Sequence, residues 1–150
     1  MRVHIATDHA GFELKEFLVA QLTSAGWEVV DHGAAVFDPE DDYPRTIIPC
    51  AEACVAEGEL GIVLGGSGNG EQIAANKVKG CRAALAYNVE TARLARQHND
   101  AQVVSLGARM LSHDEALAIA LAFLGAAFTG AARHVRRLEL LTGYENGAAL

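Results

Sequence analysis

One segment of the sequence joins a glycine-rich loop to a carboxylate: Gly65-Gly66-Ser67-Gly68-Asn69-Gly70-Glu71-Gln72. Four glycines within six residues let the backbone approach a ligand closely and turn its N–H groups inward. Where such a loop opens a helix, the free N–H groups and the helix dipole form a site for an anion. The carboxylate of Glu71 suits a reaction in which negative charge develops and a base is needed beside it.

Two known phosphate-binding loops do not fit this segment. Gly65 and Gly70 have the spacing of a P-loop, but Glu71 and Gln72 stand where that motif requires lysine and then serine or threonine. The dinucleotide fingerprint GxGxxG also fails, because the glycines run GxGxG and follow the third predicted strand. Nucleotide binding through either motif is therefore disfavoured.

Glu71 also has a purely structural interpretation. Acidic residues favour the first turn of a helix, and Asn69 with Gln72 could form a capping box. Ser67 alone is a common loop residue, without the paired base that a nucleophile needs. Residue types by themselves leave catalysis and capping both open.

A second group of residues with possible chemistry is basic. Three of the twelve basic residues lie within five positions of the sequence: Arg133, Arg136 and Arg137, with His134 among them. On a helix Arg133 and Arg137 lie four positions apart on one face, where they could bind a phosphate, although a solvated basic face is the simpler interpretation. The net charge of −7 argues against nucleic acid and anionic membranes as partners.

The elements that must position these residues alternate along the chain. Strands are predicted over about residues 2–7, 27–31, 60–64, 82–87 and 102–106. Helices are predicted over about residues 12–25, 44–57, 71–77, 89–97, 112–128 and 131–144. This alternation predicts one domain, residues 1–150, with a Rossmann-like three-layer α/β/α fold, a five-stranded parallel sheet and extra C-terminal helices. Ligands of such sheets bind beyond the carboxyl ends of the strands.

The chain carries no pattern for secretion, a membrane or a metal. Residues 116–132 lack charges, but these seventeen residues are short of the ~20 that a membrane span needs, so they predict a helix in a core or a subunit interface. The three cysteines form no disulfide or CxxC pattern, and the first residues hold no signal-peptide apolar region. A cytoplasmic protein without a metal is expected, since no histidines have zinc spacing.

Several motifs together resemble the type B ribose-5-phosphate isomerases, a family that includes the lactose-operon galactose-6-phosphate isomerase subunits. The resemblance covers essentially all 150 residues, and the long glycine-loop segment is its specific part. The matching motifs, in order, are Asp8–Gly11, Asp41–Pro44, Gly65–Lys77, His98-Asn99, Gly107–Met110 and Arg133–Arg137.

The resemblance implies an aldose–ketose isomerase without metal or cofactor, which interconverts D-ribose 5-phosphate and D-ribulose 5-phosphate through ring opening and a cis-enediolate. It assigns His98 to the anomeric hydroxyl proton and Asp8 to the ring oxygen. Many members carry a cysteine base where Gly65 stands here. The sequence instead resembles the actinobacterial-like subgroup, in which the glutamate at the position of Glu71 is the base.

The remaining assignments also follow from the resemblance. Ser67 would move a proton between O1 and O2, and the loop N–H groups of Gly66, Gly68, Asn69 and Gly70 would stabilise the enediolate. Phosphate and substrate binding would fall to His9, Asn99, Arg109, Arg133 and Arg137.

The position of His98 in the predicted fold indicates an active site shared between subunits. A helix of ten to twelve residues is ~15–18 Å long, so His98 should lie at the opposite edge of its own sheet from Asp8 and Glu71. A homodimer, or a dimer of dimers, would bring the two edges together. A six-carbon aldose phosphate (allose or galactose 6-phosphate) and a non-catalytic phosphometabolite-binding module remain the alternatives. Glu71, Ser67 and His98 together favour an enzyme, because a binding module needs no base.

Overall fold

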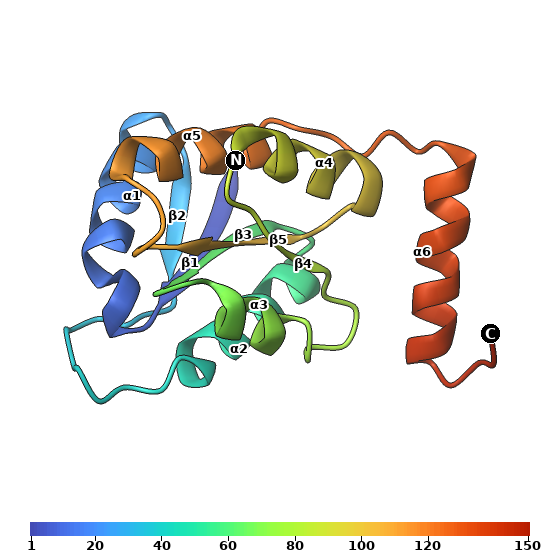
Figure 1. Ribbon diagram of the computed structural model, residues 1–150, viewed down its shortest axis with the longest axis horizontal. Helices are drawn as coiled ribbons and strands as arrows, with labels where there is room; N and C mark the ends of the chain where they lie inside the picture. The colour runs from blue at the N-terminus through green and yellow to red at the C-terminus, as the bar shows by residue number, and fades with distance from the viewer.

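A five-stranded parallel sheet forms the centre of the computed structural model, which describes all residues 1–150 (Figure 1). The strands are β1 (Arg2–Thr7), β2 (Glu28–Asp31), β3 (Leu60–Gly65), β4 (Ala83–Leu85) and β5 (Val103–Gly107). The helices are α1 (Phe12–Ser24), α2 (Pro44–Glu57), α3 (Asn69–Ala75), α4 (Val89–Asn99), α5 (His113–Leu124) and α6 (Ala132–Glu145), and a 3₁₀ turn, η1, covers His9–Gly11. The predicted three-layer α/β/α class, with five parallel strands and two C-terminal helices, is confirmed.

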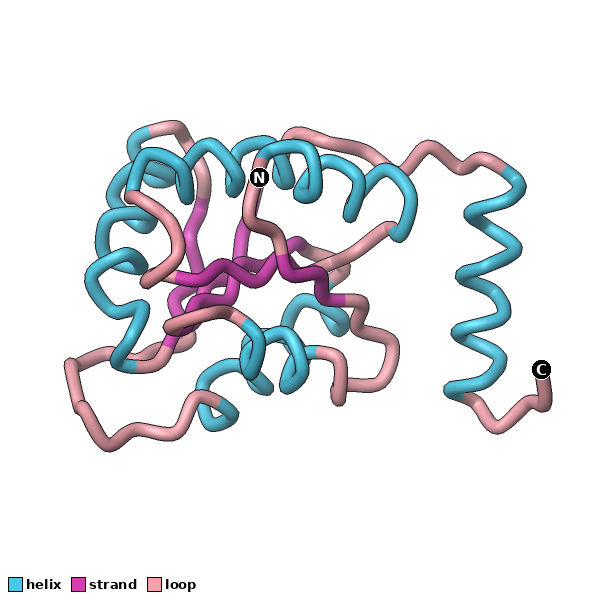
Figure 2. Tube along the Cα trace, in the orientation of Figure 1, coloured by secondary structure: helices cyan, strands magenta, loops and turns pink.

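The layers follow from the two apolar faces of the strands. Helices α1, α4 and α5 cover one face, and α2 and α3 cover the other (Figure 2). Ile5 and Leu64 belong to the core cluster of the first face, while Val63 packs with Ile47 on the second. Because both faces are covered, the central strands are continuous apolar runs rather than alternating ones.

The order of the strands, β2-β1-β3-β5-β4, positions the candidate site. The chain moves outward from β1 to β2 and then returns to the other side of β1 with β3, so the connections reverse direction between β1 and β3. Thr7 pairs with Leu64, and Gly65 pairs with Gly107, so the carboxyl ends of β1, β3 and β5 are level. Ligands of parallel sheets bind at such a switch point.

Several helix ends differ from the predicted ones by one to four residues, and the start of α3 and the end of α5 matter most. Helix α3 begins at Asn69, before the predicted residue 71, and its N-cap is Gly68 in the left-handed conformation. The proposed capping box is therefore wrong, since Asn69 lies inside the helix and its side-chain amide donates to Ser67 Oγ. Helix α5 ends at Leu124 instead of 128, so the uncharged stretch 116–132 is divided between a core helix, a loop and the first residue of α6.

Helix α6 lies beside the sheet, beyond β4, and contacts the rest of the molecule at its two ends (Figure 1). At its N-terminal end, His134 stacks on His98 of α4. At its C-terminal end, Glu145 accepts a hydrogen bond from the Gly80 N–H, at 3.0 Å. An open groove of about 500 Å³ lies between this helix and the rest of the molecule. No helix is both long and apolar enough to cross a membrane.

Candidate active site

The glycine loop follows β3 directly and is fixed by contacts beneath it. Gly68 has a φ of +82°, and a Cβ there would lie 2.8 Å from Leu85 Cδ1, so only glycine fits this position. The buried Ser105 hydroxyl donates to the Gly68 carbonyl at 2.7 Å. The N–H groups of Gly66, Ser67 and Gly68 donate to no acceptor within the chain. Three consecutive free donors make this loop a site for negative charge.

Glu71 lies in the first turn of α3 and is 4% exposed. A Cβ built on Gly65 would come within about 2.0 Å of the Glu71 carboxylate. The carboxylate therefore occupies the space that any side chain at position 65 would need. Gly65 is what allows Glu71 to reach the end of β3.

Burial sets the acidity of this carboxyl group. Loss of hydration raises the pKa of Glu71, a backbone hydrogen bond in the helix turn lowers it, and the charge of Asp8 raises it. The position in the first helical turn favours the ionised form, but burial outweighs it. A carboxyl group whose pKa moves towards neutrality is a better general base.

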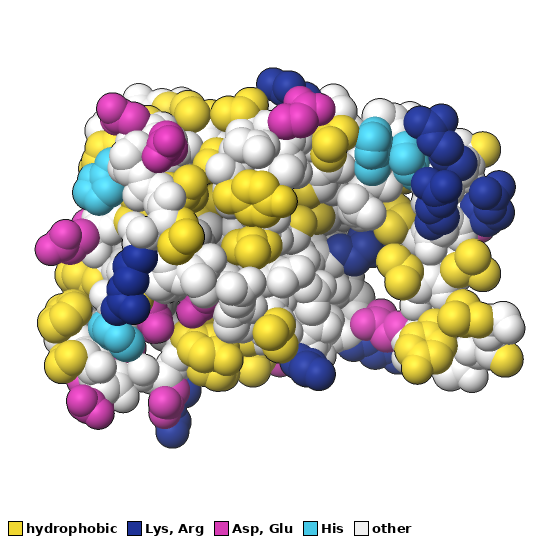
Figure 3. All heavy atoms as spheres, in the orientation of Figure 1, with side chains coloured by type: hydrophobic (Ala, Val, Ile, Leu, Met, Phe, Trp, Pro, Cys, Tyr) yellow, Lys and Arg dark blue, Asp and Glu magenta, His cyan; other side chains and the backbone are white.

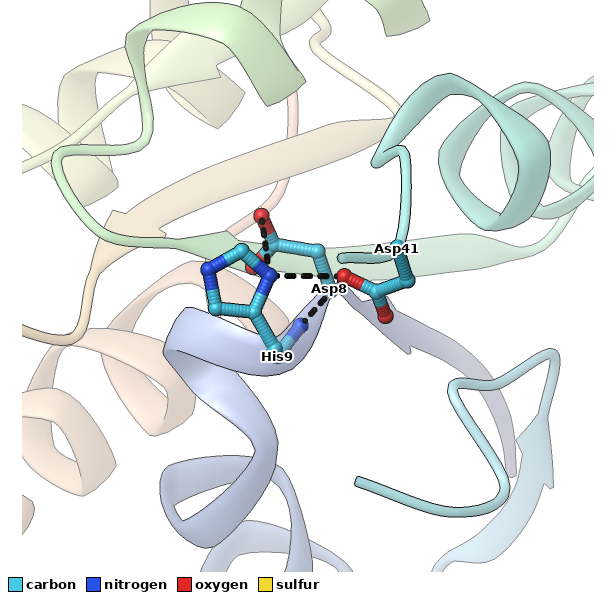
Figure 4. Close-up of side chains that lie close together, drawn as sticks. All are labelled: Asp8, His9 and Asp41. Carbon is cyan, nitrogen blue, oxygen red and sulfur yellow. Dashed lines mark hydrogen bonds and ion pairs between the residues drawn. The ribbon is translucent and has the colours of Figure 1, made fainter. Parts of the chain in front are cut away.

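Asp8 and His9 follow β1 and meet Asp41 from the loop before α2 (Figure 4). Asp8 is 7% exposed, and its Oδ1 accepts the Ala10 N–H at 2.9 Å. The Oδ1 of Asp41 faces both the main-chain N–H of His9, at 3.0 Å, and its Nδ1, at 2.7 Å. The hydrogen bond to Asp41 raises the pKa of His9, and the charge of Asp8 adds to it. Sequence reasoning noted the acidic turn but missed Asp41 as a site residue.

Arg109, Ser67 and Asn69 complete this edge of the sheet. The guanidinium of Arg109 lies over the loop, since a Cβ on Gly66 would be 3.2 Å from its Nη1. The Ser67 hydroxyl is exposed, and the Asn69 main-chain N–H and side-chain amide both point to it at 3.3 Å. The structure thus brings together the predicted residues Asp8, His9, Glu71, Arg109 and those of the loop.

His98, Asn99, Arg133 and Arg137 lie elsewhere. The Asn99 carbonyl accepts a hydrogen bond from the side chain of Arg82, which precedes β4, so the end of α4 lies at the amino edge of the sheet. This agrees with the expected separation of His98 from Glu71. The rings of His98 and His134 stack with centroids 4.3 Å apart. Burial lowers the pKa of His134, and His98, Arg133 and Arg137 lower it further.

The arginines beside this histidine pair are exposed. Figure 3 shows basic side chains gathered over the N-terminal half of α6, next to histidines. Arg133, Arg136 and Arg137 form no ion pair with a carboxylate of the chain. Three unpaired guanidinium groups in five positions are a ready site for an anion from outside the domain.

Asp8, His9 and Asp41 are also the residues that come nearest to a metal site. Their ligand atoms lie within 4.8 Å of one another. However, Nδ1 of His9 is hydrogen-bonded to Asp41, and one Asp8 oxygen accepts the Ala10 N–H. Nδ1 of His9 is therefore not free to coordinate an ion while it is bonded to Asp41, and the absence of a metal stays a prediction.

A buried carboxylate beside a loop of free N–H groups, at the switch point of a parallel sheet, is the arrangement of a Rossmann-like α/β enzyme that acts on a small anionic molecule. A sequence model of the family described as Ribose/Galactose Isomerase matches residues 3–141. The chain belongs to this family.

Individual relatives cover almost the whole chain. Ribose-5-phosphate isomerase B of Mycolicibacterium paratuberculosis is 54% identical over 146 residues, which are 97% of this chain and 92% of the relative. The Escherichia coli protein of that name is 40% identical over 146 residues, 96% of each chain.

Solved structures agree with the fold. The isomerase B of Mycoplasma genitalium, solved with bound ribulose 5-phosphate, superposes with a TM-score of 0.93 at 40% identity, over 98% of this chain and 97% of that one. The type B enzyme of Trypanosoma cruzi superposes with a TM-score of 0.93 at 38% identity, over 99% and 100% of the two chains.

Proposed function

We propose that this protein interconverts D-ribose 5-phosphate and D-ribulose 5-phosphate as an aldose–ketose isomerase. The single observation that carries the proposal is the buried Glu71 carboxylate, held at the end of β3 beside three free N–H groups. Relatives of 54% and 40% identity bear the name of this activity, and a structure of 40% identity contains ribulose 5-phosphate.

The proposed proton transfer uses the residues that the resemblance assigns to it, and the geometry of the loop supports it. Glu71 takes the proton from C2 of the open-chain aldose and returns it to C1. The cis-enediolate formed between these steps carries negative charge, which the main-chain N–H groups of Gly66–Gly70 stabilise as an oxyanion hole does, the free donors of Gly66, Ser67 and Gly68 foremost. Ser67 moves the second proton between O1 and O2.

Burial of Glu71 supports this role over a structural one. A glutamate that only stabilises a helix terminus can remain in solvent, where its pKa stays low. Here loss of water raises the pKa of Glu71, which costs stability in exchange for a stronger base. That cost also favours catalysis over a non-catalytic phosphometabolite-binding module.

Ring opening requires residues from the other edge. In the proposal His98 takes the proton of the anomeric hydroxyl, Asp8 faces the ring oxygen, and Asn99 contributes to binding. Because His98 and Asp8 lie at opposite edges of one sheet, the site is completed by a second copy of the chain. We therefore propose a homodimer, alone or as a dimer of dimers, with shared active sites.

The phosphate would be bound by cations from both edges. His9 and Arg109 lie beside the glycine loop, and Arg133 and Arg137 extend from α6. Each guanidinium can donate two parallel hydrogen bonds to a phosphate. The proposal requires no cofactor and no metal, and places the enzyme in the cytoplasm, without a nucleic-acid or membrane partner.

A direct assay tests the function. The purified protein is incubated with ribose 5-phosphate, and separately with allose 6-phosphate and galactose 6-phosphate, in buffer containing EDTA. We expect conversion of ribose 5-phosphate with the largest kcat/KM. A larger kcat/KM for a six-carbon phosphate would reassign the substrate, and binding without turnover of any sugar phosphate would indicate a binding module.

A further inference from the structure

Asp41 extends this proposal to a residue outside the predicted site. We propose that Asp41 is a positioning residue that fixes the orientation and the charge of His9, so that the Nε2–H of a His9 imidazolium faces the phosphate of the substrate. The inference rests on the proposed function, because it assumes that His9 binds phosphate.

Two hydrogen bonds to one oxygen carry the argument. Oδ1 of Asp41 accepts from the main-chain N–H of His9 at 3.0 Å and faces its Nδ1 at 2.7 Å (Figure 4). Main chain and ring are thus held by the same carboxylate, and a flipped ring would lose the second bond. Since an ionised carboxylate can only accept hydrogen bonds, the proton of His9 must be on Nδ1.

This tautomer decides what the other ring nitrogen can do. With Nδ1–H bound to Asp41, a neutral His9 presents an Nε2 lone pair, which repels a phosphate oxygen. Only the imidazolium presents an Nε2–H donor. Phosphate binding by His9 in this orientation therefore needs the charged form of the ring.

The groups around His9 favour that charged form. Asp41 is its nearest anion, Asp8 Oδ2 lies 3.9 Å from Nδ1, and Arg109 is the one cation that acts against the charge. Together these groups raise the pKa of His9, with the Asp41 hydrogen bond as the largest cause. Phe37 and Phe12, the aromatic neighbours on this side, are uncharged.

Asp41 is held in place by the loop that carries it. The Phe37 ring of this loop packs edge-on against His9, with centroids 6.5 Å apart, and against Phe12 of α1, at 6.2 Å. At the start of the loop, the buried Lys15 ammonium donates to the Ala34 carbonyl at 2.9 Å. The carboxylate therefore approaches His9 from an anchored segment.

Removing one charge without changing shape tests the proposal. In Asp41→Asn the amide oxygen can still accept the Nδ1–H, but the negative charge is gone. The matched control is Glu40→Gln on the same loop, since Glu40 is exposed and its side chain makes no hydrogen bond or ion pair. Asp41→Glu keeps the charge, and circular dichroism shows which variants fold.

Two measurements are made on each folded variant. NMR titration of the His9 ring should show its pKa falling in Asp41→Asn, unchanged in Glu40→Gln and recovering towards the wild-type value in Asp41→Glu. The KM for ribose 5-phosphate should rise roughly tenfold in Asp41→Asn at about pH 8, reflecting one lost charge-assisted hydrogen bond, and far less at about pH 6, with kcat nearly constant. The phosphate of the substrate titrates equally in all variants, so it cancels in the comparison.

The outcomes separate this inference from the proposed function. An equal His9 pKa in Asp41→Asn and Glu40→Gln would overturn the role of Asp41, whether or not the enzyme isomerises the sugar. A lowered pKa with an unmoved KM profile would overturn the contact between His9 and phosphate. Failure of wild-type protein to convert ribose 5-phosphate would refute the proposed function, while the NMR result would still report on Asp41 and His9.

Discussion

The candidate site residues form two groups, one at the carboxyl edge of the sheet and one on the N-terminal half of α6. Within a single chain, the first group is buried and hydrogen-bonded, whereas the second is exposed and has no partner. At the sheet edge, Asp8 and Glu71 are buried, and His9 is bound to Asp41. On α6, Arg133 and Arg137 are exposed and unpaired.

The two groups differ in how much of their hydration they have lost before a ligand binds. Buried carboxylates have lost their water before substrate arrives, so the cost of placing them is contained in the fold. Exposed arginines keep their hydration until an anion or a second chain covers them. We infer that the sheet edge performs the proton transfer and that α6 contributes binding.

The largest effect should follow from Glu71→Gln. The amide keeps the shape of the side chain but cannot take a proton, so kcat should fall by at least ~10²–10⁴-fold, the usual contribution of a general base. Turnover of ribose 5-phosphate measures kcat, and calorimetry should show nearly unchanged binding of the sugar phosphate. Glu90→Gln, at an exposed position in the first turn of α4, is the matched control. Near-normal turnover of Glu71→Gln would refute its role as the base.

Gly65→Ala should move the same carboxylate without removing it. The new methyl group would lie 2.0 Å from Glu71 Oε1, so the side chain must shift by about an ångström or more. A displacement of that size costs about 10²-fold in rate, and the KM should change little. Gly143→Ala on α6 is the control, because its Cβ meets only the Ala148 Cβ at 3.7 Å. Equal rates in the two variants would show that the position of Glu71 is not critical.

Arg137→Ala tests the other region. Loss of a charge-assisted contact should raise the KM for ribose 5-phosphate by roughly 10–100-fold and leave kcat nearly constant. The KM for unphosphorylated ribose should not follow. Arg136→Ala removes the same charge from the adjacent position and is expected to have a smaller effect. If both sugars lose affinity equally, α6 does not bind the phosphate.

The pattern of the sequence was sufficient for the fold class, because each strand and helix is marked locally. Gly58 ends α2, and Ser112 with Glu115 forms the capping box of α5. The strand order could not be read in this way. It depends on which strands pair across the chain, and local periodicity does not record that.

Site residues that belong to one sequence motif could be predicted. Contacts that depend on the conformation of a loop could not. Glu71 and the loop could be chosen from residue types, but the contact between Gly65 and the Glu71 carboxylate depends on the turn at Gly68. The bond between His9 and Asp41 joins residues 32 positions apart through an irregular loop. The acidic turn was the one signal that could have indicated it.

The smallest expected effect concerns the stacked rings of His98 and His134 at the N-terminal end of α6. Burial lowers the pKa of His134 below its ordinary 6.5, so the unfolded chain binds this proton more readily than the folded one. The stabilisation is complete above about pH 6.5 and is lost as the pH falls through and below that value. Urea unfolding at about pH 7.5 and about pH 5.5 should show a smaller acid-induced loss in His134→Gln than in wild type. An identical pH dependence in His134→Gln and wild type would show that the burial of His134 does not make the stability depend on pH.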